Sequence, residues 1–131
     1  MADPLATLAR LRRLEVAQAR KQLAERNVAL AAAEARHDEA CAAPGREGAH
    51  ADAAVPADYA AWVPRALAER ERAARAAQHS ANLAQMARDA LALHRTAERQ
   101  VELLREQQAA AAALKTRRRQ QALLDEFGSR R

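Results

Sequence analysis

The chain has 131 residues, with 22 lysines and arginines against 17 aspartates and glutamates, which gives a formal net charge of +5. Hydrophobic residues make up 50% of it, but most of them are alanine, and Tyr59, Trp62 and Phe127 are the only aromatic residues. Because bulky apolar side chains provide most of the free energy of burial, this composition excludes a thick globular core and favours a long all-α structure. The positive charge is compatible with an acidic partner.

The first predicted element is a helix over residues 4–43, which begins where Asp3 can cap the free amides ahead of Pro4. Apolar residues recur along it at seven-residue spacing, as in the seam of a coiled coil. One seam position holds Val16, Leu23, Leu30 and His37, and the companion position holds Ala19, Ala33 and Ala40, with Arg26 as an interruption. His37 is interpreted as a seam residue, because no second ligand stands at metal-ligand spacing from it.

Residues 44–57 are predicted to form a connector, because Pro44, Gly45 and Gly48 are signals that stop a helix. The spacing of its glycines does not match a phosphate-binding loop. Cys41, the single cysteine, precedes this connector and has no catalytic partner nearby in the sequence. One cysteine allows no intramolecular disulfide, which fits a reducing compartment.

The second predicted element is a helix over residues 58–127, with a short turn before Pro64. Its best heptad positions are Leu83, Ala90, Ala97, Leu104 and Ala111, with Met86, Leu93, Gln100, Gln107 and Leu114 three residues later. Eight of these ten residues are apolar, so we expect this stripe to face the first helix. At about 1.5 Å per residue the helix from Pro64 onward would reach roughly 95 Å, which no compact domain of this size can enclose.

The two helices are expected to fold back on each other as one antiparallel coiled-coil hairpin, with the second helix longer than the first. If Ala40 lies near the start of the second helix, Leu5 falls near residue 100, and about thirty residues then extend past the N-terminus. This overhang contains several leucines and the run from Arg117 to Arg119. Leucines at an unpaired end favour an external partner, and a second copy of the chain is one alternative.

The sequence shows no constellation of residues that would support catalysis or metal binding. Its histidines, at positions 37, 50, 79 and 94, are widely spread. Its acids stand three or four residues from arginines, as Glu98 does from Arg95, which suits ion pairs on a helix. We therefore expect a protein that is not an enzyme, with no metal and no cofactor, since a bare hairpin also lacks a pocket. No apolar run approaches the about 20 residues of a membrane span, and no secretory signal is visible, so we expect a cytoplasmic protein.

Short motifs mark both ends of the chain. Leu5-Ala6-Thr7-Leu8 is followed by Arg12, Arg13 and Glu15-Val16, and Asp125-Glu126-Phe127 is followed by Arg130 three residues on. With the chain length, the longer second helix and the aromatic residues just after the turn, these motifs resemble the FliJ family of flagellar type III export proteins. The YscO group, its counterpart in virulence type III secretion, shares this architecture, and the sequence leaves open which of the two is the match.

The resemblance implies a central stalk of a type III protein export apparatus, cytoplasmic and peripheral to the inner membrane. Such stalks insert into the hexameric export ATPase, promote its assembly and activity, link it to the cytoplasmic domain of the export gate, and associate with export chaperones. Carried over to this chain, the ATPase-binding residues would be Leu5, Leu8, Leu11, Leu123, Leu124, Phe127 and Arg130. The residues that bind the export gate would be Tyr59, Trp62, Leu67, Ala74 and His79.

Two other functions stay open at this point. The net charge of +5 favours a weak nucleic-acid-binding coiled coil, although acids dilute the basic residues and no basic run precedes a zipper. A structural homo-oligomeric coiled coil would form dimers as its concentration rises. The export stalk, by contrast, is expected to be a monomer when isolated and to bind no nucleic acid.

Overall fold

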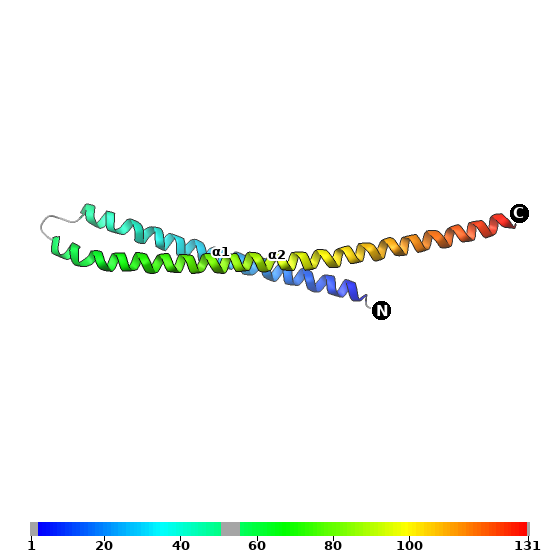
Figure 1. The fold of residues 1–131 in the computed structure, drawn as a ribbon, viewed down its shortest axis with the longest axis horizontal. Coiled ribbons are helices and arrows are strands. Elements are labelled where there is room, and N and C mark those ends of the chain that lie inside the picture. The colour runs from blue at the N-terminus through cyan, green and yellow to red at the C-terminus, as the bar shows by residue number, and fades with distance from the viewer. Residues whose placement is uncertain (1–2, 51–55, 131) are drawn as a thin grey trace. The chain divides into compact units, whose positions relative to one another are not determined.

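The computed structural model describes residues 3–50 and 56–130. Within these residues the fold is all-α and has no strand: α1 comprises Pro4–His50 and α2 comprises Pro56–Ser129 (Figure 1). The second helix is the longer, with 74 residues against 47, as the sequence predicts. The start of α1 also agrees with the sequence. The Asp3 Oδ1 atom accepts a hydrogen bond of 3.0 Å from the backbone amide of Leu5 and so caps α1.

The chain divides into two units, which are described separately. The hairpin unit runs from Gln18 to Leu91 and holds most of α1 with the first half of α2. The terminal unit holds the residues up to Ala17 and those from Ala92 onward. None of the described helices is long and apolar enough to cross a membrane.

In the hairpin unit the two helices run antiparallel (Figure 1). Near the end of α1, the backbone oxygen of Pro44 accepts a hydrogen bond of 3.2 Å from the hydroxyl of Tyr59, which lies near the start of α2. One turn or more further from this end, His37 of α1 and Ala74 of α2 line the same hollow. Contacts therefore move backward along α1 as they move forward along α2, which confirms the predicted antiparallel pairing.

Small side chains fill the core between the helices of the hairpin unit. The buried residues there are Ala19 and Ala33 on α1 and Ala73, Ala84 and Leu91 on α2. The α1 side of this core is the predicted seam, since Leu23, Leu30, His37 and Ala40 are half-buried beside the two alanines. Alanine lets the two backbones approach closely but buries little apolar area, so each contact stabilises the fold only modestly.

The seam predicted on α2 is wrong by one residue. Met86 is 65% exposed and Leu93 is 73% exposed, whereas the buried Ala84 and Leu91 each lie one residue past a predicted seam position. One residue turns a helix by about 100°, so the predicted stripe lies to one side of the buried face, with Leu83, Ala90 and Ala97 half-buried at its edge. A search for heptad periodicity selects the positions that hold the bulkiest apolar residues. The residues of α2 that face the alanine-lined side of α1 are, however, mostly small.

The predicted connector is also too long. Although Pro44 was expected to stop the helix, α1 continues through it to His50, and α2 already begins at Pro56, so Pro64 lies inside a helix. The predictions of a helix end near residue 43 and of a separate short turn before Pro64 are therefore wrong. The remainder of the expected connector, residues 51–55, lies outside the described residues.

Contacts of Tyr59 explain how α1 tolerates a proline near its end. A proline inside a helix costs about 3 kcal/mol or more, since it removes one hydrogen bond and crowds the preceding turn. The Tyr59 hydroxyl bonds to the Pro44 carbonyl, and the Tyr59 ring stacks on Trp62 with ring centroids 5.9 Å apart. Arg46 also pairs with Glu39 across two turns of α1 and thereby ties the proline-containing turn to the preceding one.

In the terminal unit the first turns of α1 lie antiparallel along α2 (Figure 1). Ala9 and Val16 of α1 and Val101 of α2 are buried, and the Glu15 Oε2 atom lies 3.7 Å from the His94 Nδ1 atom. From Glu106 to Arg130 every residue of the chain is exposed. We call residues 106–130 the free segment, which corresponds to the predicted overhang.

Candidate functional site

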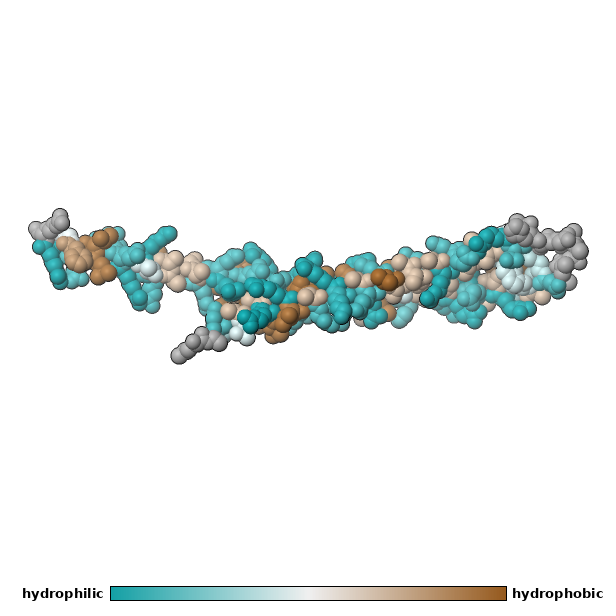
Figure 2. All heavy atoms as spheres, turned by 180° about the vertical axis from the view of Figure 1, so that it is seen from behind, coloured by the Kyte–Doolittle hydropathy of each residue, from teal (hydrophilic) through white to brown (hydrophobic). Residues whose placement is uncertain are grey.

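All seven residues predicted to bind an ATPase lie in the terminal unit, on two helical segments. On α1, Leu5 and Leu8 are half-buried and Leu11 is 49% exposed. The residues of the free segment are more exposed, with values of 55% for Leu123, 66% for Leu124 and 66% for Phe127. Figure 2 shows hydrophobic side chains, in brown, gathered near the C-terminal end of α2.

The structure does not bring these two groups into one surface. Since Glu15 lies beside His94 and the helices are antiparallel, Leu5 falls near residue 104 of α2. Leu123 lies nineteen residues further along, which is about 30 Å at the rise of an α-helix. The predicted ATPase-binding residues therefore form two separate apolar surfaces, one near the start of α1 and one at the end of the free segment.

The apolar patch at the end of the free segment has a charged border. Leu123 and Phe127 are one helical turn apart, so their side chains are neighbours on one face. A shallow hollow of about 340 Å³ beside them is lined by Arg119, Ala122, Leu123 and Glu126. Arg130, which was predicted to contact a partner, donates a hydrogen bond of 2.9 Å to the Glu126 Oε1 atom, so a partner would meet it as part of an ion pair.

A run without acidic residues precedes this patch. No aspartate or glutamate occurs between Glu106 and Asp125, while four cations do, namely Lys115, Arg117, Arg118 and Arg119. All four are exposed, and among the described residues none of them takes part in an ion pair. The middle of the free segment thus presents uncompensated positive charge, which attracts an acidic surface.

The five residues predicted to bind an export gate lie in the hairpin unit but not on one surface. Tyr59 and Trp62 are half-buried in their stack beside the end of α1. Leu67, which is 42% exposed, and Ala74 both line a second hollow further along α2. His79 is exposed and lies five residues past Ala74, about 140° around the helix, so it faces in another direction.

The second hollow lies in the hairpin unit and contains two of the predicted residues, Leu67 and Ala74. It has a volume of about 460 Å³ and is lined by His37, Cys41, Leu67, Arg70, Glu71 and Ala74. The Cys41 Sγ atom lies 3.4 Å from the His37 Nε2 atom. Sequence reasoning missed this hollow, for which the four-residue spacing of His37 and Cys41 was the only signal. In the part of the chain that the structure describes, no group of three or more His, Cys, Asp or Glu residues is arranged to hold a metal ion.

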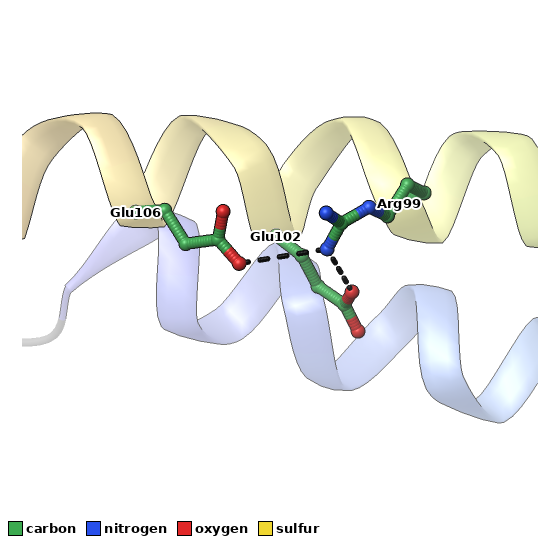
Figure 3. Close-up of polar contacts among 3 residues, drawn as sticks. All are labelled: Arg99, Glu102 and Glu106. Carbon is green, nitrogen blue, oxygen red and sulfur yellow. Dashed lines mark hydrogen bonds and ion pairs between the residues drawn. The ribbon is translucent and has the colours of Figure 1, made fainter.

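Most ion pairs of the described residues join two side chains of the same helix. The Arg99 Nη1 atom lies 3.3 Å from Glu102 Oε2 and 3.5 Å from Glu106 Oε1, and all three residues belong to α2 (Figure 3). On α1, the hydrogen bond with Glu39, and next the negative charge of its carboxylate, raise the pKa of Arg46. These pairs lie on the surfaces of the helices, and Glu102 and Glu106 also line an open hollow of about 380 Å³ with Arg105 and Ala109.

The bulky stripe that was predicted to face α1 is instead an exposed surface. We call its part in the terminal unit the outward stripe, which comprises Leu93, Ala97, Gln100, Leu104, Gln107, Ala111 and Leu114. Leu93 is 73% exposed, and Leu104 and Leu114 are each 48% exposed. The heptad pattern therefore identified a real apolar stripe but assigned it to the wrong partner.

No protein-family model matches the chain, and no curated protein or solved structure matches it either. The resemblance to the FliJ family or the YscO group therefore stays a prediction.

Proposed function

We propose that the chain is a non-enzymatic central stalk of a type III protein export apparatus, most consistent with the flagellar system. The observation that supports the proposal is the free segment, which ends in the exposed side chains of Leu123, Leu124 and Phe127. An exposed helical segment with an apolar end suits insertion into the central hole of a hexameric ATPase. In this role one copy of the chain promotes assembly and activity of the ATPase from the cytoplasmic side of the membrane.

Charge supports the same proposal. Lys115 and the run from Arg117 to Arg119 lie just before the apolar patch, so the entering segment is positively charged. An acidic lining of the ATPase opening would attract this segment, and the apolar patch would then bury Leu123 and Phe127. The second helical surface, at Leu5 and Leu8, would contact a different level of the ring, because it lies about 30 Å away along α2.

The hairpin unit provides the proposed contact with the export gate. Leu67 and Ala74 line its hollow, and Tyr59 stacks on Trp62 next to the end of α1. Aromatic and aliphatic side chains that are only half-buried are suitable anchors for a partner protein. His79 faces elsewhere, so it would contact the gate or an export chaperone only from another side.

The test is ATP hydrolysis by the export ATPase of the same organism, measured with and without this chain, together with the size of the ATPase assembly. We expect faster hydrolysis and more hexamer when the chain is present. Truncation after Leu114 should abolish this stimulation, because it removes the apolar patch and the four cations. Stimulation that is unchanged by the truncation would refute the assignment of the free segment.

A second pair of variants tests the surface near the start of α1 separately. Leu5→Asp and Leu8→Asp place acids on half-buried positions of that surface and should weaken ring binding. Leu14→Asp is the matched control, since Leu14 is 63% exposed and is not among the predicted contacts. Equal loss in all three variants would mean that the effect is general and not specific to a binding surface.

The four uncompensated cations favour one other candidate, weak binding to duplex nucleic acid. Retention on duplex DNA at about 150 mM salt tests it, because nonspecific phosphate binding is already weakened there. Strong retention, with no effect on ATP hydrolysis, would favour nucleic-acid binding over the stalk.

A further inference from the structure

The outward stripe of the terminal unit is exposed at every position except Ala97, which is half-buried at the edge of the surface that α1 covers. The residues of α2 that are covered there are the buried Val101 and the half-buried His94, Ala97, Glu98, Glu102 and Arg105. Gln100 and Leu104 each precede one of these positions by one residue, which turns them by about 100° around the helix. A second helix could therefore lie on the outward stripe beside α1, without displacing it.

The order of residues in the outward stripe is nearly the same in both directions. It reads Leu, Ala, Gln, Leu, Gln, Ala, Leu, and Leu104 is its centre. Ala97 and Ala111 lie seven residues before and after Leu104. Gln100 and Gln107 lie four before and three after, and Leu93 and Leu114 lie eleven before and ten after. Such a sequence matches itself when one copy is reversed.

The charged residues of this part of α2 lie on the other side of the helix. Arg99, Glu102 and Glu106, the ion pairs of Figure 3, are about 140° to 160° around α2 from Leu104. Thr96, Leu103 and Ala110, which border the stripe on the side away from α1, are uncharged. A partner on the stripe would therefore meet no charge within residues 93–114 on that border.

We propose that the outward stripe binds the same stripe of a second copy of this chain, antiparallel, with a twofold axis at Leu104. In such an interface each surface must complement itself, because the same residues come from both copies. The reversed order places leucine on leucine, alanine on alanine, and Gln100 opposite Gln107 of the other copy. Each glutamine side chain carries an NH2 group that donates hydrogen bonds and a carbonyl oxygen that accepts them. The two side chains can therefore form hydrogen bonds with each other and fix the register of the two helices.

The pairing also provides a partner for part of the free segment. In one copy α1 covers α2 only up to about Arg105, and residues 106–114 are exposed on all sides. In the antiparallel pair these residues lie beside residues 94–102 of the other copy, where α1 of that copy is also present. Each half of the interface is then a layer of three helical segments, which buries more apolar area than two helices do.

Sedimentation velocity measured over a wide range of concentrations tests the proposal on the full chain alone. We expect a monomer at low concentration and a dimer as the concentration rises. Leu104→Lys places two like charges next to each other on the twofold axis, so the dissociation constant of the dimer should rise about tenfold or more. A chain that stays monomeric throughout, or a dimer that Leu104→Lys does not weaken, would overturn the proposal.

Leu14→Lys is the matched control for this substitution. Leu14 is 63% exposed, and it lies two residues before the buried Val16, on the side of α1 away from α2. This variant should dimerise as the unchanged chain does, and both lysine variants should keep the same helical circular dichroism. If Leu14→Lys weakened the dimer as much as Leu104→Lys does, the interface would not be the outward stripe.

Disulfide formation tests the orientation in a Cys41→Ala background, which removes the single cysteine. Because the axis lies at Leu104, Leu104→Cys should crosslink two copies of itself upon oxidation. Gln100→Cys and Gln107→Cys should each crosslink poorly alone but well when the two variants are mixed, since these positions face each other only in the antiparallel pair. Efficient crosslinking of each glutamine variant with itself would indicate a parallel pair and refute the proposed orientation.

The pairing goes beyond the proposed export stalk, which uses one copy of the chain, so the dimer would have to dissociate before that copy enters the ring. Leu123, Leu124 and Phe127 lie outside the outward stripe. The dimer is measured without an ATPase, so its absence would refute the pairing and leave the stalk untouched. Loss of ATPase stimulation in the truncated chain would test only the proposed role of the end of the free segment, and not the pairing.

Discussion

Two glycines near the end of α1 differ in a single contact, and that contact decides what a methyl group would do. A Cβ atom at Gly45 would meet no atom within 4 Å, whereas one at Gly48 would lie 2.8 Å from the Tyr59 hydroxyl oxygen. Glycine inside a helix is less stable than alanine by roughly 0.5–1 kcal/mol. Gly45→Ala should therefore raise the free energy of unfolding by about that amount, which urea denaturation measures.

Gly48→Ala, by contrast, should raise the free energy of unfolding little or not at all. The new methyl group would push the Tyr59 hydroxyl away from the Pro44 carbonyl and remove a hydrogen bond that contributes about 0.5–1.5 kcal/mol. In a Tyr59→Phe background the hydroxyl is absent, so Gly48→Ala should then stabilise as Gly45→Ala does. A full gain from Gly48→Ala in the unchanged chain would show that the Tyr59 contact is not made in solution.

At the scale of one helix, seven-residue spacing predicted the seam of α1 but not that of α2. On α1 the bulkiest seam residues, Leu23 and Leu30, are on the face that packs, so bulk and burial agree. On α2 the buried positions include Ala73 and Ala84, which a search for bulky apolar residues does not select because alanine is small. The outward stripe was therefore the stronger pattern, and only the structure shows that α1 does not cover it.

The most completely buried of the described residues is Ala84 in the hairpin unit, with 0% of its surface exposed. Ala84→Leu should lower the free energy of unfolding by about 1–3 kcal/mol, because the larger side chain forces the two helices apart. The matched control is Ala68→Leu, at an exposed position of the same unit with the same helix preference. Thermal unfolding followed by circular dichroism checks both, and equal melting temperatures would mean that α1 does not pack on Ala84.

For the whole chain, composition and periodicity were enough to predict an all-α pair of antiparallel helices with a longer second helix. They did not predict that both helices continue through Pro44 and Pro64, because local signals that stop a helix can be outweighed by contacts such as that of Tyr59. The candidate site was only partly predictable. Exposure of Leu123 and Phe127 agrees with a binding surface, but the separation of this surface from Leu5 depends on helix register, which alanine seams specify weakly.

Deletion of the end of α2 provides the last prediction, which separates folding from binding. Every residue from Glu106 to Arg130 is exposed, so truncation after Leu114 removes helix but none of the buried core. We expect the midpoint of urea unfolding to stay nearly unchanged, while the total helical signal falls in proportion to the residues removed. Val101→Asp is the contrasting variant, because it places an unpaired charge in the buried seam of the terminal unit and should destabilise it. If the truncation lowered the unfolding midpoint as much as Val101→Asp does, the free segment would have a partner within its own chain, and its role as an exposed binding surface would be wrong.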